Sequence, residues 1–253
     1  MTAQTLTETS WNAGAPAAES IKAPSKRTAR IAGLLYLGVG IFGGFAQGYV
    51  GPKMYAAGDA ATTAMNVVAN PGLVRLGVVA DLANQAFFIF LALTLYALLK
   101  HVQPSVARAM LAMVAIAVAI GSLNSVFLFE GLQVATDASA ATAWGAAGVN
   151  SVVMMLLDLH HYGLLAAQIF FGLWLAPLGI LAYKSRLFPK ALAGVLVLGT
   201  VCYLIDLLAA FLAPELGRMI HGLIVIPCAV AEIWMVLYLL IVGVGTPKKL
   251  PIA

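Results

Sequence analysis

The chain has 253 residues, of which 62% are hydrophobic and only 9% are charged. A soluble domain carries roughly 25% charged residues, so this composition excludes a protein whose surface faces water on all sides. Apolar runs long enough to cross a bilayer, about 20 residues each, recur along the chain and predict an all-α, polytopic protein of the lipid bilayer. The net charge of +4 does not indicate nucleic-acid binding, because the basic residues cluster at the ends of these runs.

Two segments lie outside the apolar runs. The first, residues 1–27, is rich in Ala, Ser, Thr and Pro and lacks the hydrophobic stretch of a signal peptide. Such a composition cannot bury enough apolar surface to fold, so it predicts a disordered tail. We therefore expect a cytoplasmic tail over 1–27, a six-span transmembrane domain over 28–245 and a second cytoplasmic tail over 246–253.

Prolines and glycines divide the transmembrane domain into six spans. In the first loop, Asp59 stands in the N-cap position of a short helix, and Pro71 suits the first turn of the second span. Another short helix is expected around Trp144 in the outer loop 131–150. The predicted spans cover residues 30–50, 73–99, 106–129, 162–183, 191–212 and 219–242.

Basic residues gather at alternate ends of these spans. With the N-terminus placed inside, eleven Lys and Arg residues lie on the inner side and three, Lys53, Arg75 and Arg218, on the outer side. Cytoplasmic segments of membrane proteins carry such an excess of Lys and Arg. We therefore expect both termini in the cytoplasm, as an even number of spans requires.

Polar residues recur inside the predicted spans, where an ionisable group costs about 2.5–3.5 kcal/mol at mid-bilayer. Several fall in the outer half of four different spans, and three of them share one face of the second span. Because hydrocarbon penalises exposed polar groups, we expect these side chains to converge on an outward-facing polar pocket. They are Asp81, Asn84, Gln85, Asn124, Gln168 and Asp206.

The stretch LLDLHHYG, residues 156–163, stands just before the predicted fourth span. If the helix extends outward, Asp158 and His161 share a stripe with Gln168, whereas His160 points elsewhere. We expect Asp158, both histidines and His221 to edge the pocket. Contact of these histidines with lipid headgroups is the plain alternative.

Two further charged residues need partners. Arg75 begins the second span, where it would orient an acid or hold an anionic group. Glu232 lies near the middle of the sixth span, the most costly position for a carboxylate. It either reaches a partner such as Tyr203 or Arg75 or is protonated, and both a structural and a transport role are open.

Three chemical interpretations compete. The pocket residues Arg75, Asp81, Asn84, Gln85, Asn124, His161, Gln168, Asp206 and Glu232 predict binding, sensing or transport of a small polar molecule or ion. Alternatively, His161, His221, Asp158 and Asp206 are ligand types for a divalent metal in a membrane-embedded enzyme, although no HExxH spacing supports this. In the third interpretation these polar groups only bridge helices, and the protein is a structural or assembly partner.

Small residues give one further expectation. Gly40, Gly44 and Gly48 form a seam at spacing four on the first span, which permits close contact with another helix of the chain or with a second copy in a homo-oligomer. We expect the intrachain contact. Cys202 and Cys228 lie inside apolar runs and predict buried thiols.

Five segments of the chain read RIAGLLYLGVGIFGGF, NPGLVRLGVVADLANQ, LALTLYALLK, IFFGLWLAPLGILAYKSRLFPKALAGVLVLGTVCYLIDLLAAFLAP and AEIWMVLYLLIVG. Together they resemble one family of bacterial integral membrane proteins, the family of domain of unknown function 4386. The resemblance covers about residues 28–243 and implies a bacterial inner-membrane protein, with Arg75, Asp81, Asp206 and Glu232 at motif positions. It implies no activity, and the adjacent histidines are less characteristic of its pattern.

Overall fold

The computed structural model describes residues 25–245, so the two predicted tails lie almost entirely outside the described residues. Lys26 and Arg27, expected in the first tail, begin the first helix instead. The described residues form helices and no strands, which confirms the predicted all-α class. The elements are α1 (Lys26–Gly43), the π-helix η1 (Gly44–Val50), α2 (Gly51–Met54), α3 (Ala60–Ala69), α4 (Pro71–Leu99), α5 (Pro104–Thr136), α6 (Ala138–Leu173), α7 (Leu175–Ser185), α8 (Lys190–Leu212) and α9 (Pro214–Ile241).

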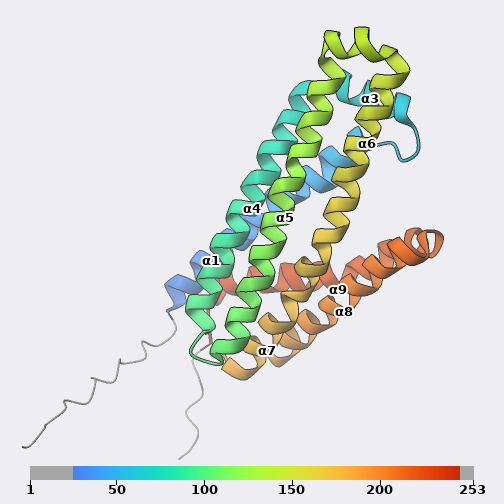
Figure 1. The fold of residues 1–253 in the computed structure, drawn as a ribbon. Coiled ribbons are helices and arrows are strands. Elements are labelled where there is room, and N and C mark those ends of the chain that lie inside the picture. Colours follow the sequence, from blue (N-terminus) through green and yellow to red (C-terminus); the bar gives the residue numbers. More distant parts are fainter. Residues whose placement is uncertain (1–24, 246–253) are drawn as a thin grey trace, which may run out of the picture.

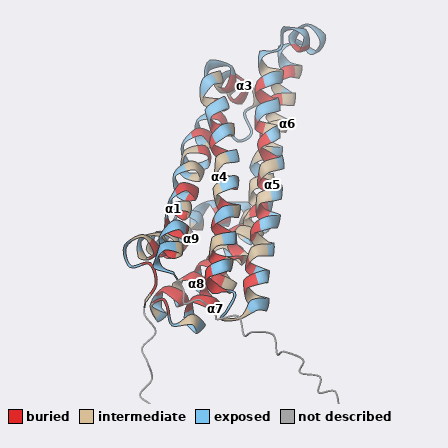
Figure 2. Cartoon of the chain, turned by 90° about the vertical axis from the view of Figure 1, so that its left-hand side faces the viewer, coloured by how far each residue is buried: buried red, intermediate tan, exposed pale blue. Residues whose placement is uncertain are grey.

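Six stretches of the described chain are helical, long and apolar enough to cross a membrane, which confirms the predicted number of spans. Their outward faces carry large apolar side chains such as Leu34, Phe90, Leu123 and Leu223, all of which are exposed. Figure 2 shows these exposed faces around the buried interior of the bundle. A surface of this kind matches the hydrocarbon of a lipid bilayer.

The long helices α4, α5 and α6 run side by side, and α1 packs against α4 and α9 (Figure 1). The hairpin of α8 and α9 packs against α7 and the adjoining part of α6, and its tip points away from the rest of the bundle. Gly243 lies against Lys26, so both described ends of the chain meet at one end of the bundle. We call this the terminal end, and the opposite end, with α3 and Asp137, the distal end.

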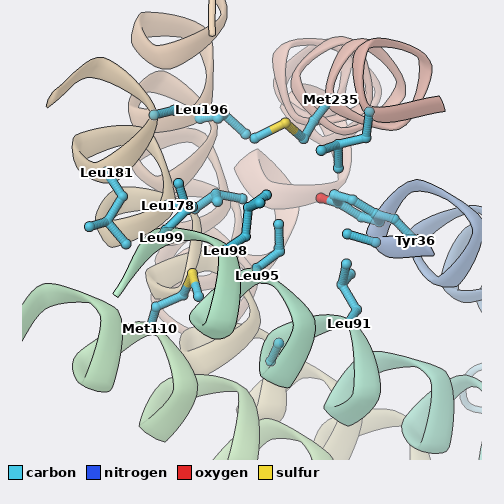
Figure 3. Packing of buried hydrophobic residues seen from close by; sticks show 14 of the residues in the cluster. Tyr36, Leu91, Leu95, Leu98, Leu99, Met110, Leu178, Leu181, Leu196 and Met235 are labelled. Carbon is cyan, nitrogen blue, oxygen red and sulfur yellow. The ribbon is translucent and has the colours of Figure 1, made fainter. Parts of the chain in front are cut away.

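Two apolar clusters hold the bundle together. The terminal cluster joins α1, α4, α5 and α7 with α8 and α9. In Figure 3, Tyr36 of α1 and Met235 of α9 lie over Leu91, Leu95 and Leu98 of α4. The distal cluster joins η1, α2 and α3 with the distal parts of α4, α5 and α6. Burial of such side chains contributes about 1.5–3 kcal/mol each in water, and inside a bilayer their close packing takes over this role.

Prolines and short polar side chains set the helix boundaries. The Asp59 side chain accepts a hydrogen bond from the Thr62 amide, 2.9 Å away, and Pro71 lies in the first turn of α4, as predicted. Helix α6 ends at Leu173 and α7 resumes at Leu175. Pro177 explains this break, because it cannot donate to the Leu173 carbonyl four residues earlier.

The prediction of a loop over residues 131–150 is wrong, because nearly all of this segment is helical. Only Asp137 separates α5 from α6, and its side chain accepts a hydrogen bond from the Ser139 amide, 2.8 Å away. The segment is rich in alanine, the strongest helix former, so the helices continue beyond their most apolar parts. A kink at Gly145, where φ is 66°, follows the exposed Trp144. LLDLHHYG therefore lies in the interior of α6.

The expectation that the glycine seam packs against another helix of the same chain is also wrong. Gly40, Gly44 and Gly48 are exposed, and a methyl group added at any of them would meet no atom within 4 Å. The close contacts of α1 are made instead by Gly38, against the ring of Phe87, and by other glycines on its buried face. Cys202 and Cys228 are free and buried, as predicted.

Candidate functional site

A band of polar side chains separates the two apolar clusters. On α4 the clusters are separated between Val74 and Phe88, and on α5 between Ala117 and Leu128. Five polar residues in these intervals are buried and face neighbouring helices, namely Asp81, Asn84, Gln85, Asn124 and Ser125, whereas Arg75 is exposed. We call this band the polar layer; it consists of Gln47, Asp81, Asn84, Gln85, Asn124, Ser125 and His160.

Asp81 lies at the centre of the polar layer, with 2% of its surface exposed. It accepts a hydrogen bond of 2.5 Å from the Ser125 hydroxyl on α5 and one of 3.4 Å from the Gln47 amide on η1. The π-helix that presents Gln47 has a local cause. Pro52 cannot donate to the Gly48 carbonyl and its ring crowds that carbonyl, so the turn before Pro52 widens.

Asn84 and Gln85 continue the polar layer along α4. The Asn84 amide lies against Gly43 of α1, where an added methyl group would come within 3.3 Å of its Oδ1 atom. That oxygen is buried and accepts no hydrogen bond from the described residues. Gln85 fills the space beside Gly121 of α5, since an added methyl group there would lie 2.5 Å from its Nε2 atom. Both amides are therefore held in place by glycines on the facing helices.

Asn124 and His160 join α5 to α6. Asn124 Nδ2 donates a 2.7 Å hydrogen bond to the His160 carbonyl, and His160 Nδ1 lies 3.0 Å from the Asn124 carbonyl. In the tautomer with the proton on Nδ1, His160 donates this second bond. His160 thus faces α5, whereas its neighbour His161 stacks on Tyr55, and α6 lies close to α5 at Gly163, against which Asn124 packs.

A cavity of about 230 Å³ opens beside the polar layer, between η1 with α2, α5 and α6. Four polar side chains line it: Gln47, Tyr55, His160 and His161. The rest of its lining is apolar and includes Leu164. Protein binding sites combine apolar walls with a few placed polar groups in this way.

Tyr55 forms one wall of this cavity and is fixed on two sides. Its ring stacks on His161, with centroids 4.9 Å apart, and its hydroxyl donates a 2.5 Å hydrogen bond to Asp158. Burial, together with this bond to the carboxylate, raises the pKa of Tyr55, so the phenol stays protonated and keeps donating. Asp158 therefore positions the cavity wall instead of lining it.

A second cluster of polar side chains lies where α6, α8 and α9 meet. Gln168 donates a 3.0 Å hydrogen bond to Asp206, and the Nδ1 atom of His221 lies 2.9 Å from the other oxygen of this carboxylate. Nearer the terminal end, the Tyr203 hydroxyl donates a 2.7 Å hydrogen bond to Glu232, the partner expected from the sequence. These contacts tie the α8–α9 hairpin together and to α6.

The predicted pocket residues are thus divided between two regions. His160 and Gln168 stand eight residues apart on α6, or about 12 Å at 1.5 Å per residue. Asp81, Asn84, Gln85 and Asn124 belong to the first region, and Asp206 and Gln168 to the second. Arg75 is exposed on α4 and forms no ion pair with any of residues 25–245.

The residues predicted as metal ligands are divided in the same way. Asp206 and His221 form a pair, whereas Asp158 and His161 both contact Tyr55. In the part of the chain that the structure describes, no three His, Cys, Asp or Glu side chains are grouped so as to hold a metal ion. The predicted set of four is therefore not gathered at one point.

A model of one protein family, described as Domain of unknown function (DUF4386), matches residues 31–243. The chain belongs to this family. No curated protein and no solved structure is similar enough to be matched to it. The match covers the whole polar layer and the cavity, and it confirms the resemblance seen in the sequence. The description names no activity, so a function has to be argued from the site.

Three residues of the site were missed from the sequence. Gln47 was overlooked because its span was treated as a regular helix, although Pro52, five residues later, is a signal for a widened turn. Ser125 is adjacent to Asn124 and seemed an ordinary small residue. Tyr55 lies just beyond the predicted first span, and no pattern in the sequence pairs it with Asp158.

Proposed function

We propose that this membrane protein binds a small polar molecule in the cavity between η1, α2, α5 and α6. The observation that carries the proposal is that Gln47 of η1, Tyr55 after α2, and His160 and His161 of α6 line one cavity. Gln47, His160 and His161 belong to candidate membrane spans, where polar groups are costly, so their grouping around a cavity supports ligand binding. The volume of about 230 Å³ equals that of about eight water molecules at about 30 Å³ each, so the ligand has to be a small molecule.

The charges around the cavity narrow the class of ligand. The described residues that line it include no lysine or arginine. Asp81 lies behind Gln47, and Asp158 lies behind Tyr55. Two carboxylates near an apolar space favour a neutral or cationic ligand over an anion, because charges interact strongly where water is scarce. We therefore expect the ligand to be a small amine or amide. The Gln47 amide and the imidazoles of His160 and His161 would bind it, and it would lie against the stacked rings of Tyr55 and His161.

The distribution of basic residues indicates from which side of the membrane a ligand would enter the cavity. Their excess near the terminal end supports a cytoplasmic location for that end in a bacterial inner membrane. The cavity adjoins the distal cluster, so the ligand would enter from the outer side. Binding of this kind serves a sensor as well as a transporter.

The direct test is ligand-dependent stabilisation of the purified protein by a panel of small amines, amides and organic anions. A ligand at one hundred times its Kd stabilises the folded state by about 2.7 kcal/mol, which corresponds to a rise in Tm of about 5 °C or more. His161→Ala and the cavity-filling L164W should abolish the shift. The matched control is His101→Ala, since His101 is exposed in the turn before α5. A shift that both cavity variants retain would place the ligand elsewhere.

A further inference from the structure

Asp81 is a buried carboxylate without a cationic partner among the described residues. The ion pairs within residues 25–245 join Arg218 to Glu215 and His221 to Asp206. The two groups that contact Asp81, the Ser125 hydroxyl and the Gln47 amide, are both neutral. A buried charge in an apolar surrounding is costly unless it is paired or coordinates a metal ion.

Asn84, one turn further along α4, supplies a buried oxygen without a hydrogen-bond partner among the described residues. Its Oδ1 atom is buried and accepts no hydrogen bond from the described chain, and only 5% of the residue is exposed. Asp81 and Asn84 are one turn apart on α4, and their partners Gln47 and Gly43 are one turn apart on the facing helix. Both oxygens therefore face the seam between α4 and the α1–η1 segment.

The groups at this seam form a set of oxygen donors. Asp81 offers a carboxylate, Asn84 an amide oxygen, Ser125 a hydroxyl and Gln47, after rotation of its amide, another oxygen. Oxygen donors of this kind are preferred by hard cations. Only one of them carries a charge, so a monovalent cation would be neutralised, whereas a divalent cation would leave a buried positive charge.

The backbone beside this set supports the same assignment. Gln47 belongs to the π-helix η1, and π-turns inside helices often occur at functional sites. Membrane transporters place their coupling ions near the midplane, next to interrupted helices. Here the irregular helix, the unpaired carboxylate and the unsatisfied amide meet at one depth, between the two apolar clusters.

We propose that the buried residues Asp81, Asn84 and Ser125, together with the exposed Gln47, form a binding site for a monovalent metal cation such as Na⁺. Gln47 also lines the cavity, so the cation site is one side chain away from it. A cation at Asp81 would draw the Gln47 oxygen inward and change the group that Gln47 presents to the cavity. The site does not depend on a cavity ligand, and it is tested without one.

The test compares the Tm of the purified protein in NaCl, KCl and LiCl with its Tm in choline chloride, at equal ionic strength and fixed pH. We expect a saturable rise in Tm with at least one alkali cation and none with choline. Asp81→Asn should abolish this response, and Asn84→Ala should raise the half-saturating concentration roughly tenfold. Asp206→Asn is the matched control, because it changes another buried carboxylate outside the polar layer and should retain the response.

Three results would overturn the proposal. The first is an equal Tm in all four salts. The second is a cation response that persists in Asp81→Asn and Asn84→Ala or, where Asp81→Asn does not fold, in Ser125→Ala and Asn84→Ala. The third is a Tm that changes with pH but with no alkali cation, because a proton alone would then satisfy Asp81.

Discussion

The imidazole of His221 contacts a carboxylate that is otherwise buried: Nδ1 lies 2.9 Å from Oδ1 of Asp206, and the two side chains are 61% and 6% exposed. The other oxygen of Asp206 accepts a hydrogen bond from Gln168. One carboxylate therefore links α8 to α9 and to α6. The tip of the α8–α9 hairpin points away from the other helices, so the Gln168–Asp206 bond adds a polar contact to the packing of the hairpin against α6.

His221→Ala should destabilise the hairpin. The change leaves one oxygen of Asp206 without a partner, and an unsatisfied buried acceptor costs about 1–3 kcal/mol. Because His221 is largely exposed, water will replace part of the lost bond, and we expect the lower part of that range. Denaturant unfolding of the purified protein measures the change, with His101→Ala as the control. Equal stability of the two variants would contradict a structural role for this contact.

Gly163→Ala should disrupt the contact between α5 and α6. An added methyl group would lie 2.1 Å from Oδ1 of Asn124, whose amide is held by the His160 carbonyl. Overpacking of this kind costs typically about 1–3 kcal/mol, and it would displace His160 from the cavity wall. Gly194→Ala is the matched control, because an added methyl group there meets no atom within 4 Å. The prediction fails if thermal unfolding ranks the two variants as equal.

Local composition was sufficient to predict the six spans, because the cost of crossing hydrocarbon depends on the residues of each span alone. It was not sufficient for the ends of α5 and α6. There the hydropathy falls within an alanine-rich segment that remains a good helix, and only Asp137 interrupts it. The same reasoning correctly placed Asp81, Asn84 and Gln85 of α4 in the interior, since lipid penalises them on the outer face, but it failed for Arg75, which is exposed.

The partners within the site depend on helix rotation, which the sequence did not reveal. His160 and His161 are neighbours separated by about 100° around α6, so the rotation of α6 about its own axis decides which of them meets Asn124. The π-helix adds a similar shift, because its wider turn changes the direction of every later side chain relative to a regular helix. Gln47 reaches Asp81 for this reason, and a regular 3.6-residue period did not predict that contact.

The cap of α3 should make its local stability depend on pH. Hydrogen bonds from the Thr62 hydroxyl and amide lower the pKa of Asp59, which lies outside the membrane spans. A carboxylate with a lowered folded-state pKa stabilises the fold above its unfolded pKa of about 4, and this contribution disappears as the pH falls through the folded value. Asp59→Ala should therefore speed hydrogen exchange at the Thr62 amide at neutral pH.

A comparison of the same two proteins at acid pH is the control for this effect. At a pH low enough to protonate Asp59, wild type and Asp59→Ala should exchange at the same rate once the intrinsic pH dependence is divided out. Asp137, whose pKa is lowered by the Ser139 hydroxyl and amide, should behave in the same way at the start of α6. A difference between wild type and variant that is the same at acid and neutral pH would show that the carboxylate charge is not involved.

The exposed seam of Gly40, Gly44 and Gly48 is where we expect a second copy of the chain. Added methyl groups at these positions meet nothing within 4 Å in a single chain, which leaves the small-residue face free for close packing against another helix. Gly40→Leu should therefore reduce self-association, measured by crosslinking in nanodiscs, without lowering the Tm of the monomer. Ala86→Leu, at an exposed position on α4, is the control for added apolar bulk. If Gly40→Leu and wild type crosslink to the same extent, the seam faces lipid.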